Sequence, residues 1–186
     1  MTRKIKILVQ PIGNVDEKSI NRLIDDLNSK IEFFSASPSN LQFSIPPEAY
    51  NPLRKQYYSP VILRKLCEKL MDEPFNRILG VADIDLYVEG LNFIFGEAQF
   101  KGKCAIITLY RLKPEFYGEE RNDELLYERA LKEAVHEIGH TLGLNHCPNK
   151  ICVMHFSNSI WDTDIKSYKY CKSCKNKLLN FISQMK

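Results

Sequence analysis

Three histidines and a glutamate stand at a spacing that suits a catalytic metal ion. His136 and His140 are four residues apart, and Glu137 directly follows the first of them. Side chains four apart on a helix lie on one face, about one turn from each other, so both imidazoles can bind a single ion. Glu137 would then face a metal-activated water as a general base without binding the metal itself. The pattern predicts hydrolysis of a carbonyl compound such as a peptide.

A third ligand becomes available if the helix ends before His146. A straight helix would carry His146 too far along its axis, but Gly143 lies between it and His140. Glycine adopts left-handed backbone angles at little cost, so it can end the helix and turn the chain back. Three neutral imidazoles leave one position of a zinc ion to water, as catalytic sites require. We predict a catalytic Zn²⁺ bound by His136, His140 and His146; the alternative is that these histidines bind no metal.

Four cysteines near the histidines predict a second metal site of a different kind. Cys147, Cys152, Cys171 and Cys174 form a Cx4C…CxxC pattern. Four thiolates complete a tetrahedral zinc site and leave no open position, which indicates a structural ion. Such an ion stabilises a segment with little core of its own, because it binds only the folded form. The alternative is a redox-active CxxC at the last two cysteines, although no thioredoxin-like pattern surrounds it.

The composition excludes several classes of function. The chain has 186 residues, a formal net charge of +3 and 44% hydrophobic residues, which are ordinary values for one globular domain. The charge is too small to indicate nucleic-acid binding, and no nucleic-acid-binding motif accompanies it. The apolar run at residues 5–9 is too short for a signal peptide or a membrane span. We expect a cytoplasmic monomer that binds neither nucleic acid nor membrane, with cysteines used for metal rather than for disulfides.

Hydrophobic periodicity predicts strands and helices that alternate up to the histidines. Strands are expected at residues 4–10, 32–34, 41–45, 77–87, 92–98 and 104–112. Helices are expected at residues 16–29, 59–72, 122–142 and 172–184, and the third of them carries the first two histidines. Cys67 and Cys104 fall in a predicted helix and a predicted strand, so we expect them to be buried packing residues.

The residues from 136 to 146 read HEIGHTLGLNH and resemble the HExxHxxGxxH motif of the metzincin metallopeptidases. Met154 follows at a position where these enzymes carry a methionine, and the four cysteines make the resemblance closest to the archaemetzincins. The resemblance implies that Glu137 is the catalytic base and that Met154 lies in a turn beneath the catalytic zinc. Phe156 stands where some metzincins have a tyrosine that can touch zinc, so no such ligand is expected.

The same resemblance implies an α+β fold close to α/β. It consists of a twisted, mostly parallel mixed sheet with a backing helix and an active-site helix, followed by a small C-terminal lobe with the methionine turn and a final helix. We expect one catalytic domain over residues 1–186, with an N-terminal lobe at 1–143 and a C-terminal lobe at 144–186. Two zinc ions per chain are implied, one catalytic and one structural, with a peptide or protein as substrate.

Several alternatives stay open. We predict a zinc-dependent metallopeptidase; the alternatives are a zinc-stabilised peptide-binding protein with little or no hydrolytic activity and a cysteine-based redox protein. The choice between endopeptidase and aminopeptidase depends on loops that the pattern does not define. Residues 92–98 are expected to form an antiparallel edge strand that pairs with a peptide, or else an ordinary structural strand. His155 is either a packing histidine or a substrate contact.

Overall fold

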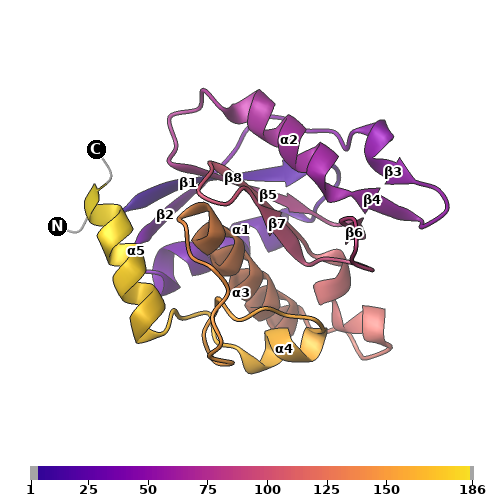
Figure 1. Ribbon diagram of the computed structural model, residues 1–186. Coiled ribbons are helices and arrows are strands. Elements are labelled where there is room, and N and C mark those ends of the chain that lie inside the picture. Colours follow the sequence, from indigo (N-terminus) through magenta and orange to yellow (C-terminus); the bar gives the residue numbers. More distant parts are fainter. Residues whose placement is uncertain (1–3, 185–186) are drawn as a thin grey trace.

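The computed structural model describes residues 4–184, which form two β-sheets and five α-helices (Figure 1). The strands are β1 (Ile5–Ile12), β2 (Phe34–Pro38), β3 (Tyr50–Asn51), β4 (Gln56–Tyr58), β5 (Arg77–Ala82), β6 (Leu86–Tyr87), β7 (Gly96–Ala98) and β8 (Cys104–Thr108). The helices are α1 (Glu17–Lys30), α2 (Ser59–Leu70), α3 (Asp123–Thr141), α4 (Ile160–Ile165) and α5 (Lys172–Gln184). Among residues 4–184, no helix is both long enough and apolar enough to cross a membrane.

The larger sheet has the strand order β2-β1-β5-β8-β7. Its first four strands are parallel, and β7 runs antiparallel to β8 at the edge. Figure 1 shows α2 on one face of this sheet and α1 and α3 on the other. The fold class implied by the resemblance is therefore confirmed: α1 backs the sheet and α3 is the active-site helix. The edge position expected for residues 92–98 is also confirmed, although the strand itself begins only at Gly96.

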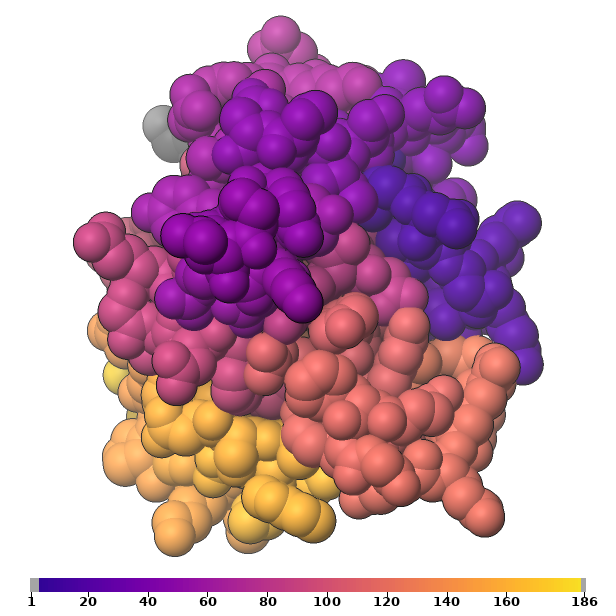
Figure 2. Space-filling view, turned by 90° about the vertical axis from the view of Figure 1, so that its right-hand side faces the viewer, coloured from indigo at the N-terminus to yellow at the C-terminus, as the bar shows by residue number. Residues whose placement is uncertain are grey.

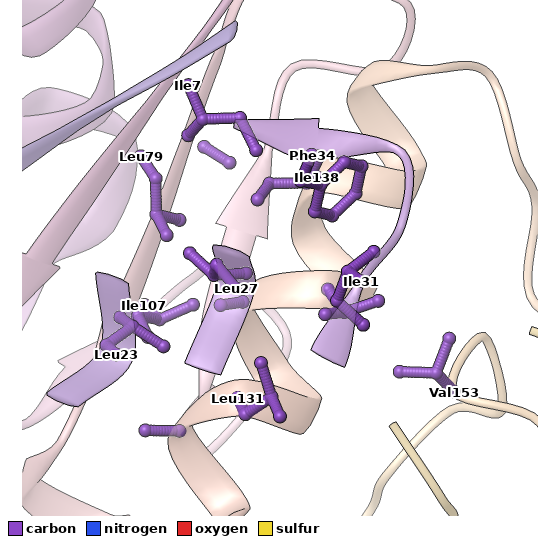
Figure 3. Close-up of a cluster of buried hydrophobic side chains, with 14 of the residues drawn as sticks. Ile7, Leu23, Leu27, Ile31, Phe34, Leu79, Ile107, Leu131, Ile138 and Val153 are labelled. Carbon is purple, nitrogen blue, oxygen red and sulfur yellow. The ribbon is translucent and has the colours of Figure 1, made fainter. Parts of the chain in front are cut away.

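The main core lies between the sheet, α1 and α3 (Figure 3). Strand residues Ile7, Leu79 and Ile107 are fully buried in it. They face side chains of the two helices, among them Leu23 and Leu27 of α1 and Leu131 and Ile138 of α3. This packing fixes the rotation of α3 about its axis, so that the opposite side of the helix presents its histidines away from the core.

Helix α3 begins with an Asn122 cap, whose side-chain oxygen accepts a hydrogen bond from Leu125 N at 3.0 Å. Asp123 and Glu124 in its first turn complement the helix dipole. Ion pairs then join its middle to the chain near α4. Arg129 Nε lies 2.7 Å from Asp164 Oδ1, and Lys166 Nζ lies 2.9 Å from Glu133 Oε1. Figure 1 accordingly shows α4 alongside α3.

A smaller sheet of order β3-β4-β6 flanks the larger one. The turn between β3 and β4 carries Leu53, whose side chain is 96% exposed. In Figure 2 the residues near 50–58 lie in the upper half of the face, above two adjoining segments: the one near 110–122 at lower right and the one that contains α4 at lower left. The segment near 110–122 includes short 3-10 helices at Tyr110–Leu112 and Pro114–Tyr117.

Several secondary-structure expectations are wrong. The strand expected at 77–87 is divided into β5 and β6, which lie in different sheets, and the strand expected at 104–112 ends at Thr108. Residues 41–45 form no strand; instead, Leu41 O accepts a hydrogen bond from Gln10 Nε2 at 2.9 Å, and Phe43 O accepts one from Gly13 N at 2.8 Å. Their alternating apolar residues therefore reflect a loop packed beside the end of β1. The strand expected at 32–34 lies at Phe34–Pro38, where Asn28 of α1 binds the backbone of Ala36. Helix α4 was not expected, since its exposed apolar residues show no buried periodicity.

Candidate active site

The three predicted histidine ligands converge at the C-terminal end of α3. His140 Nε2 lies 3.0 Å from His136 Nε2 and 3.2 Å from His146 Nε2. A zinc ion bound tetrahedrally at about 2.0–2.1 Å requires nitrogen atoms about 3.3 Å apart. The observed separations fit such an ion, and the histidine triad is a candidate catalytic zinc site.

The other ring nitrogens of the first two ligands are held by backbone carbonyls. His136 Nδ1 lies 2.7 Å from Val153 O, and His140 Nδ1 lies 2.7 Å from Leu144 O. A carbonyl accepts a hydrogen bond from Nδ1–H, which keeps the proton on Nδ1 and leaves the Nε2 lone pair free for a metal. Burial lowers the pKa of His136 well below its usual value, and the nearby Lys166 lowers it further. Both effects favour the neutral imidazole that binds metal.

The chain reverses at Gly143, as the sequence predicts. Gly143 has φ +83° and its N–H donates to His140 O at 3.0 Å. Leu144 N then donates to Gly139 O at 3.0 Å, which completes the end of the helix. The left-handed residue turns the chain back so that His146 reaches the first two histidines.

Glu137 lies against the edge strand of the sheet. A Cβ on residue 96 would stand 2.6 Å from Glu137 Cγ and 2.8 Å from its Oε1, so Gly96 allows this contact. The Glu137 side chain is only 5% exposed. Burial raises the pKa of its carboxyl well above the usual value, and the charge of Glu133 adds to this effect.

A cleft of about 600 Å³ opens over these residues. Its lining includes Glu137 and all three histidines of the triad. Strand β7 and the loop before it form one wall, and Phe156 to Asn158 form part of another. The histidine triad and the edge strand therefore border the same cleft.

Met154 lies fully buried beneath the active-site helix. Its side chain contacts Gly139, and its carbonyl accepts a hydrogen bond from Cys147 N at 2.8 Å. Tyr170 closes the same region, since its hydroxyl donates to Val135 O at 3.0 Å. The methionine thus packs the turn that follows α3 in the chain against this helix.

The four cysteines gather into a second cluster beside the triad. All four sulfur atoms lie within 4.8 Å of one another, and Cys147 Sγ is 3.8 Å from Cys171 Sγ. A tetrahedral zinc ion with bonds of about 2.3 Å needs sulfur atoms about 3.8 Å apart. A hydrogen bond from the Cys174 backbone lowers the pKa of Cys171 to about 7, which favours a thiolate. The cluster fits a structural zinc ion.

Comparison with known proteins agrees with this geometry. Residues 15–180 match the profile of Peptidase family M54. The chain is 46% identical to the archaemetzincin of Methanocaldococcus jannaschii over 96% of its own length and 95% of the relative. The match to the archaemetzincin of Pyrococcus furiosus is 47% identical and covers 92% and 91%.

This chain belongs to the archaemetzincin family. As an archaemetzincin it is a zinc metallopeptidase.

Solved structures support the same assignment. The crystal structure of archaemetzincin from Archaeoglobus fulgidus, complexed with malonate, is 39% identical, with a TM-score of 0.79, and the match covers 93% of this chain and 99% of that one. The Methanopyrus kandleri archaemetzincin gives a TM-score of 0.83 at 30% identity, covering 97% of each chain. A zinc-dependent peptidase from Methanocorpusculum labreanum gives 0.82 at 29% identity, covering 92% and 99%.

One expectation about the cysteines of this archaemetzincin is wrong. Cys67 of α2 and Cys104 of β8 are buried, as expected, but they form a disulfide rather than packing as free thiols. Their Cα atoms lie 5.8 Å apart across the layer between helix and sheet, 37 residues apart in sequence. Only the packing of α2 on β8 brings them together, and no local pattern reveals it.

The sequence also did not identify several residues that support the site. The carbonyls of Val153 and Leu144 orient two imidazoles, and the buried pair Lys166–Glu133 lies beside the base. The Phe156 ring lies 4.9 Å from that of His146, centroid to centroid. Backbone acceptors carry no residue-type signal, and one lysine among several in a lysine-rich stretch gives no indication that it is buried.

His155 lies outside the set of residues that line the cleft. Its Nδ1 is 2.9 Å from Cys147 O, and its own carbonyl lies 3.5 Å from Lys166 Nζ. The side chain therefore bridges the methionine turn to the first cysteine of the cluster. Of the two expectations for this residue, the contacts favour packing.

Proposed function

We propose that this archaemetzincin hydrolyses peptide bonds with Glu137 as general base and with a zinc ion held by His136, His140 and His146. The observation that carries the proposal is the convergence of three Nε2 atoms in a cleft that also contains the Glu137 carboxyl. Zinc at this position supplies Lewis-acid polarisation of a carbonyl and lowers the pKa of water towards about 7.

Glu137 performs the proton transfers. Its carboxylate takes a proton from the attacking water and delivers it to the nitrogen of the departing amine. Burial raises the pKa of the Glu137 carboxyl, which makes it a stronger base than an exposed glutamate. Contact with Gly96 on one side restricts where the carboxyl can move.

The free edge of β7 supports binding of an extended peptide. Thr108 N donates to Phe95 O at 2.9 Å, and Gln99 N donates to Cys104 O at 3.0 Å. In an antiparallel pair, bonded and non-bonded residues alternate, so the backbone groups of Gly96 and Ala98 face outward from the sheet. A substrate strand can pair with these groups and pass beside Glu137.

A second zinc ion bound by Cys147, Cys152, Cys171 and Cys174 is proposed to be structural. Cys147 directly follows His146 in the chain, so fixing the thiolate restricts the approach of the third imidazole. The same ion ties the methionine turn to the start of α5, where Cys174 lies. This segment has few buried apolar residues and gains rigidity from the metal.

The test combines metal content with turnover. Protein purified without added metal should contain two zinc ions, and mild chelation should remove the triad ion first because its fourth position is open. Glu137→Gln should keep both ions and reduce peptide turnover by about 10²- to 10⁴-fold. Glu128→Gln, which changes an exposed carboxylate on the same helix, should leave turnover unchanged.

Two results would contradict the proposal. Full activity of Glu137→Gln would show that another group acts as base. Peptide binding with two zinc ions but no turnover by the wild-type protein would favour the alternative, a zinc-stabilised peptide-binding protein.

A further inference from the structure

Glu97 lies on β7, one residue beyond the glycine that contacts the catalytic base. Gly96 faces Glu137 of α3, so Glu97 projects from the opposite face of the sheet. Its register partner Ile106 packs in the core cluster that contains α2 residues. Figure 1 shows β7 between α2 and α3, and both Glu97 and Pro60 at the start of α2 line the cleft.

The Glu97 carboxyl has an unsatisfied oxygen. Its Oε2 is buried, and among residues 4–184 it has no hydrogen-bond partner. Ser59 Oγ, in a residue that is 0% exposed, is likewise buried without a partner. Burial raises the pKa of Glu97, and the neighbouring Ser59 hydroxyl opposes this effect. A buried polar atom without a partner is costly, so Oε2 gains from a donor, and because Glu97 lines the cleft, a rotation of its side chain would bring this oxygen to a donor on the substrate.

No lysine or arginine among the described residues of the cleft lining can pair with this oxygen. Besides Glu137, that lining includes Glu89, Glu97 and Glu133, but no lysine or arginine of the described chain. Glu133 is already paired with the buried Lys166, and Glu89 is exposed to solvent. Glu97 is therefore the cleft carboxylate that is part-buried and lacks an ion-pair partner among the described residues.

A bound peptide would bring its own groups to this position. Side chains of a strand paired with β7 alternate between the two faces of the sheet. Those on the α3 face lie towards Glu137, and those on the α2 face lie towards Glu97. A peptide that begins at this point would instead present its terminal ammonium to the same wall.

We propose that Glu97 is a specificity-determining residue that binds a positively charged nitrogen of the substrate in this cleft. The nitrogen is either the free amino terminus of a peptide or the side chain of a lysine or arginine. Both donate charge-assisted hydrogen bonds to a carboxylate, which are about twice as strong as those from neutral donors. The inference rests on the proposed function, because it needs the peptide to lie along β7.

The test is peptide binding to zinc-loaded Glu137→Gln protein, with and without Glu97→Gln, measured by calorimetry. The probes are alanine-glycine hexapeptides that carry one lysine, placed at each position in turn. A matched peptide has norleucine in place of each lysine. Every peptide is made both with a free and with an acetylated amino terminus. Glu97→Gln keeps the shape of the side chain and removes its negative charge. Glu89→Gln is the matched control, because it removes an exposed carboxylate from the same cleft.

We expect Glu97→Gln to weaken binding of the cationic peptides by about 10- to 100-fold, the factor carried by a hydrogen bond to a charged group. Binding of neutral, acetylated norleucine peptides should not change, and Glu89→Gln should have little effect. A loss of affinity confined to peptides with a free amino terminus would identify the terminal ammonium as the ligand. A loss that follows lysine at one position would identify a side-chain site. Either result supports the proposal.

Equal weakening of cationic and neutral peptides would overturn it and indicate a purely structural role. No weakening by Glu97→Gln, or the same weakening by Glu89→Gln, would also overturn it. Because binding is measured without turnover, these outcomes are distinct from failure of the proposed function. That failure would appear as absence of hydrolysis of the neutral peptides by wild-type protein that carries both zinc ions.

Discussion

Gly139 of the active-site helix lies directly against the sulfur of Met154, with no space for a Cβ between them. A Cβ on residue 139 would overlap Met154 Sδ and stand 3.1 Å from its Cε. The helix that carries the first two ligands therefore rests on the methionine turn through a glycine. This contact links the turn between α3 and α5 to the position of the imidazoles, without any bond to the metal.

Gly139→Ala should lower the free energy of unfolding by about 1–3 kcal/mol, the usual cost of overpacking a core. In a Met154→Ala background the space is open, so the same change should instead stabilise by up to about 1 kcal/mol through helix propensity. Denaturant unfolding of the four proteins in this cycle measures the coupling. Equal destabilisation in both backgrounds would show that Met154 does not cause the effect.

Gly96→Ala should impair catalysis more than stability. The added Cβ would stand 2.6 Å from Glu137 Cγ and 2.8 Å from Ile106 O, and Glu137 is the group free to move. We expect kcat to fall by about 10-fold or more, because a displaced base loses its alignment with the water. Zinc content should stay at the wild-type value. Ala98→Gly alters the same strand without approaching Glu137 and serves as the control; an equal fall in its kcat would contradict this explanation.

The two clusters of histidines and cysteines could be found from the sequence because each consists of short, local patterns. His136 and His140 are neighbours on any helix, and Gly143 provides the reversal that His146 requires. The cysteine pairs likewise stand close together in the chain. Resemblance to a family then supplied the fold, which the spacing of ligands alone does not determine.

What the sequence did not reveal depends on contacts between distant segments. The disulfide joins residues 37 apart, and its two cysteines look like ordinary core residues in their own elements. Lys166 lies in a lysine-rich stretch, yet it is 1% exposed because Glu133 and the His155 carbonyl surround its amine. The disulfide appears only after α2 has packed on β8, and the burial of Lys166 only after α4 has packed on α3.

The Lys166–Glu133 pair should be essential for stability in a way that surface pairs are not. The two side chains are 0% and 4% exposed, and Thr163 Oγ1 also donates to Glu133 at 3.0 Å. Lys166→Met would leave a buried carboxylate without its cation, which typically costs about 3–5 kcal/mol. Adding Glu133→Gln should restore part of this loss, because the remaining group carries no charge.

Lys65→Met is the matched comparison. Lys65 pairs with Glu48, and their side chains are 39% and 52% exposed. We expect a loss of only about 0–1 kcal/mol for this exposed pair. Chemical denaturation of the three variants provides the measurement. A similar loss for Lys65→Met and Lys166→Met would contradict the importance assigned to burial.

The Cys67–Cys104 disulfide predicts a specific thiol count. In denaturant with a zinc chelator and no reductant, four of the six cysteines should react with a thiol reagent, because Cys147, Cys152, Cys171 and Cys174 are free once zinc is removed. Closing a loop of 37 residues restricts the unfolded chain by about 3–4 kcal/mol. Reductant should therefore lower Tm with zinc present, whereas a Cys67→Ala/Cys104→Ala protein should show no response. Six reactive thiols in the wild-type protein would show that the pair is reduced and that both residues only pack in the core.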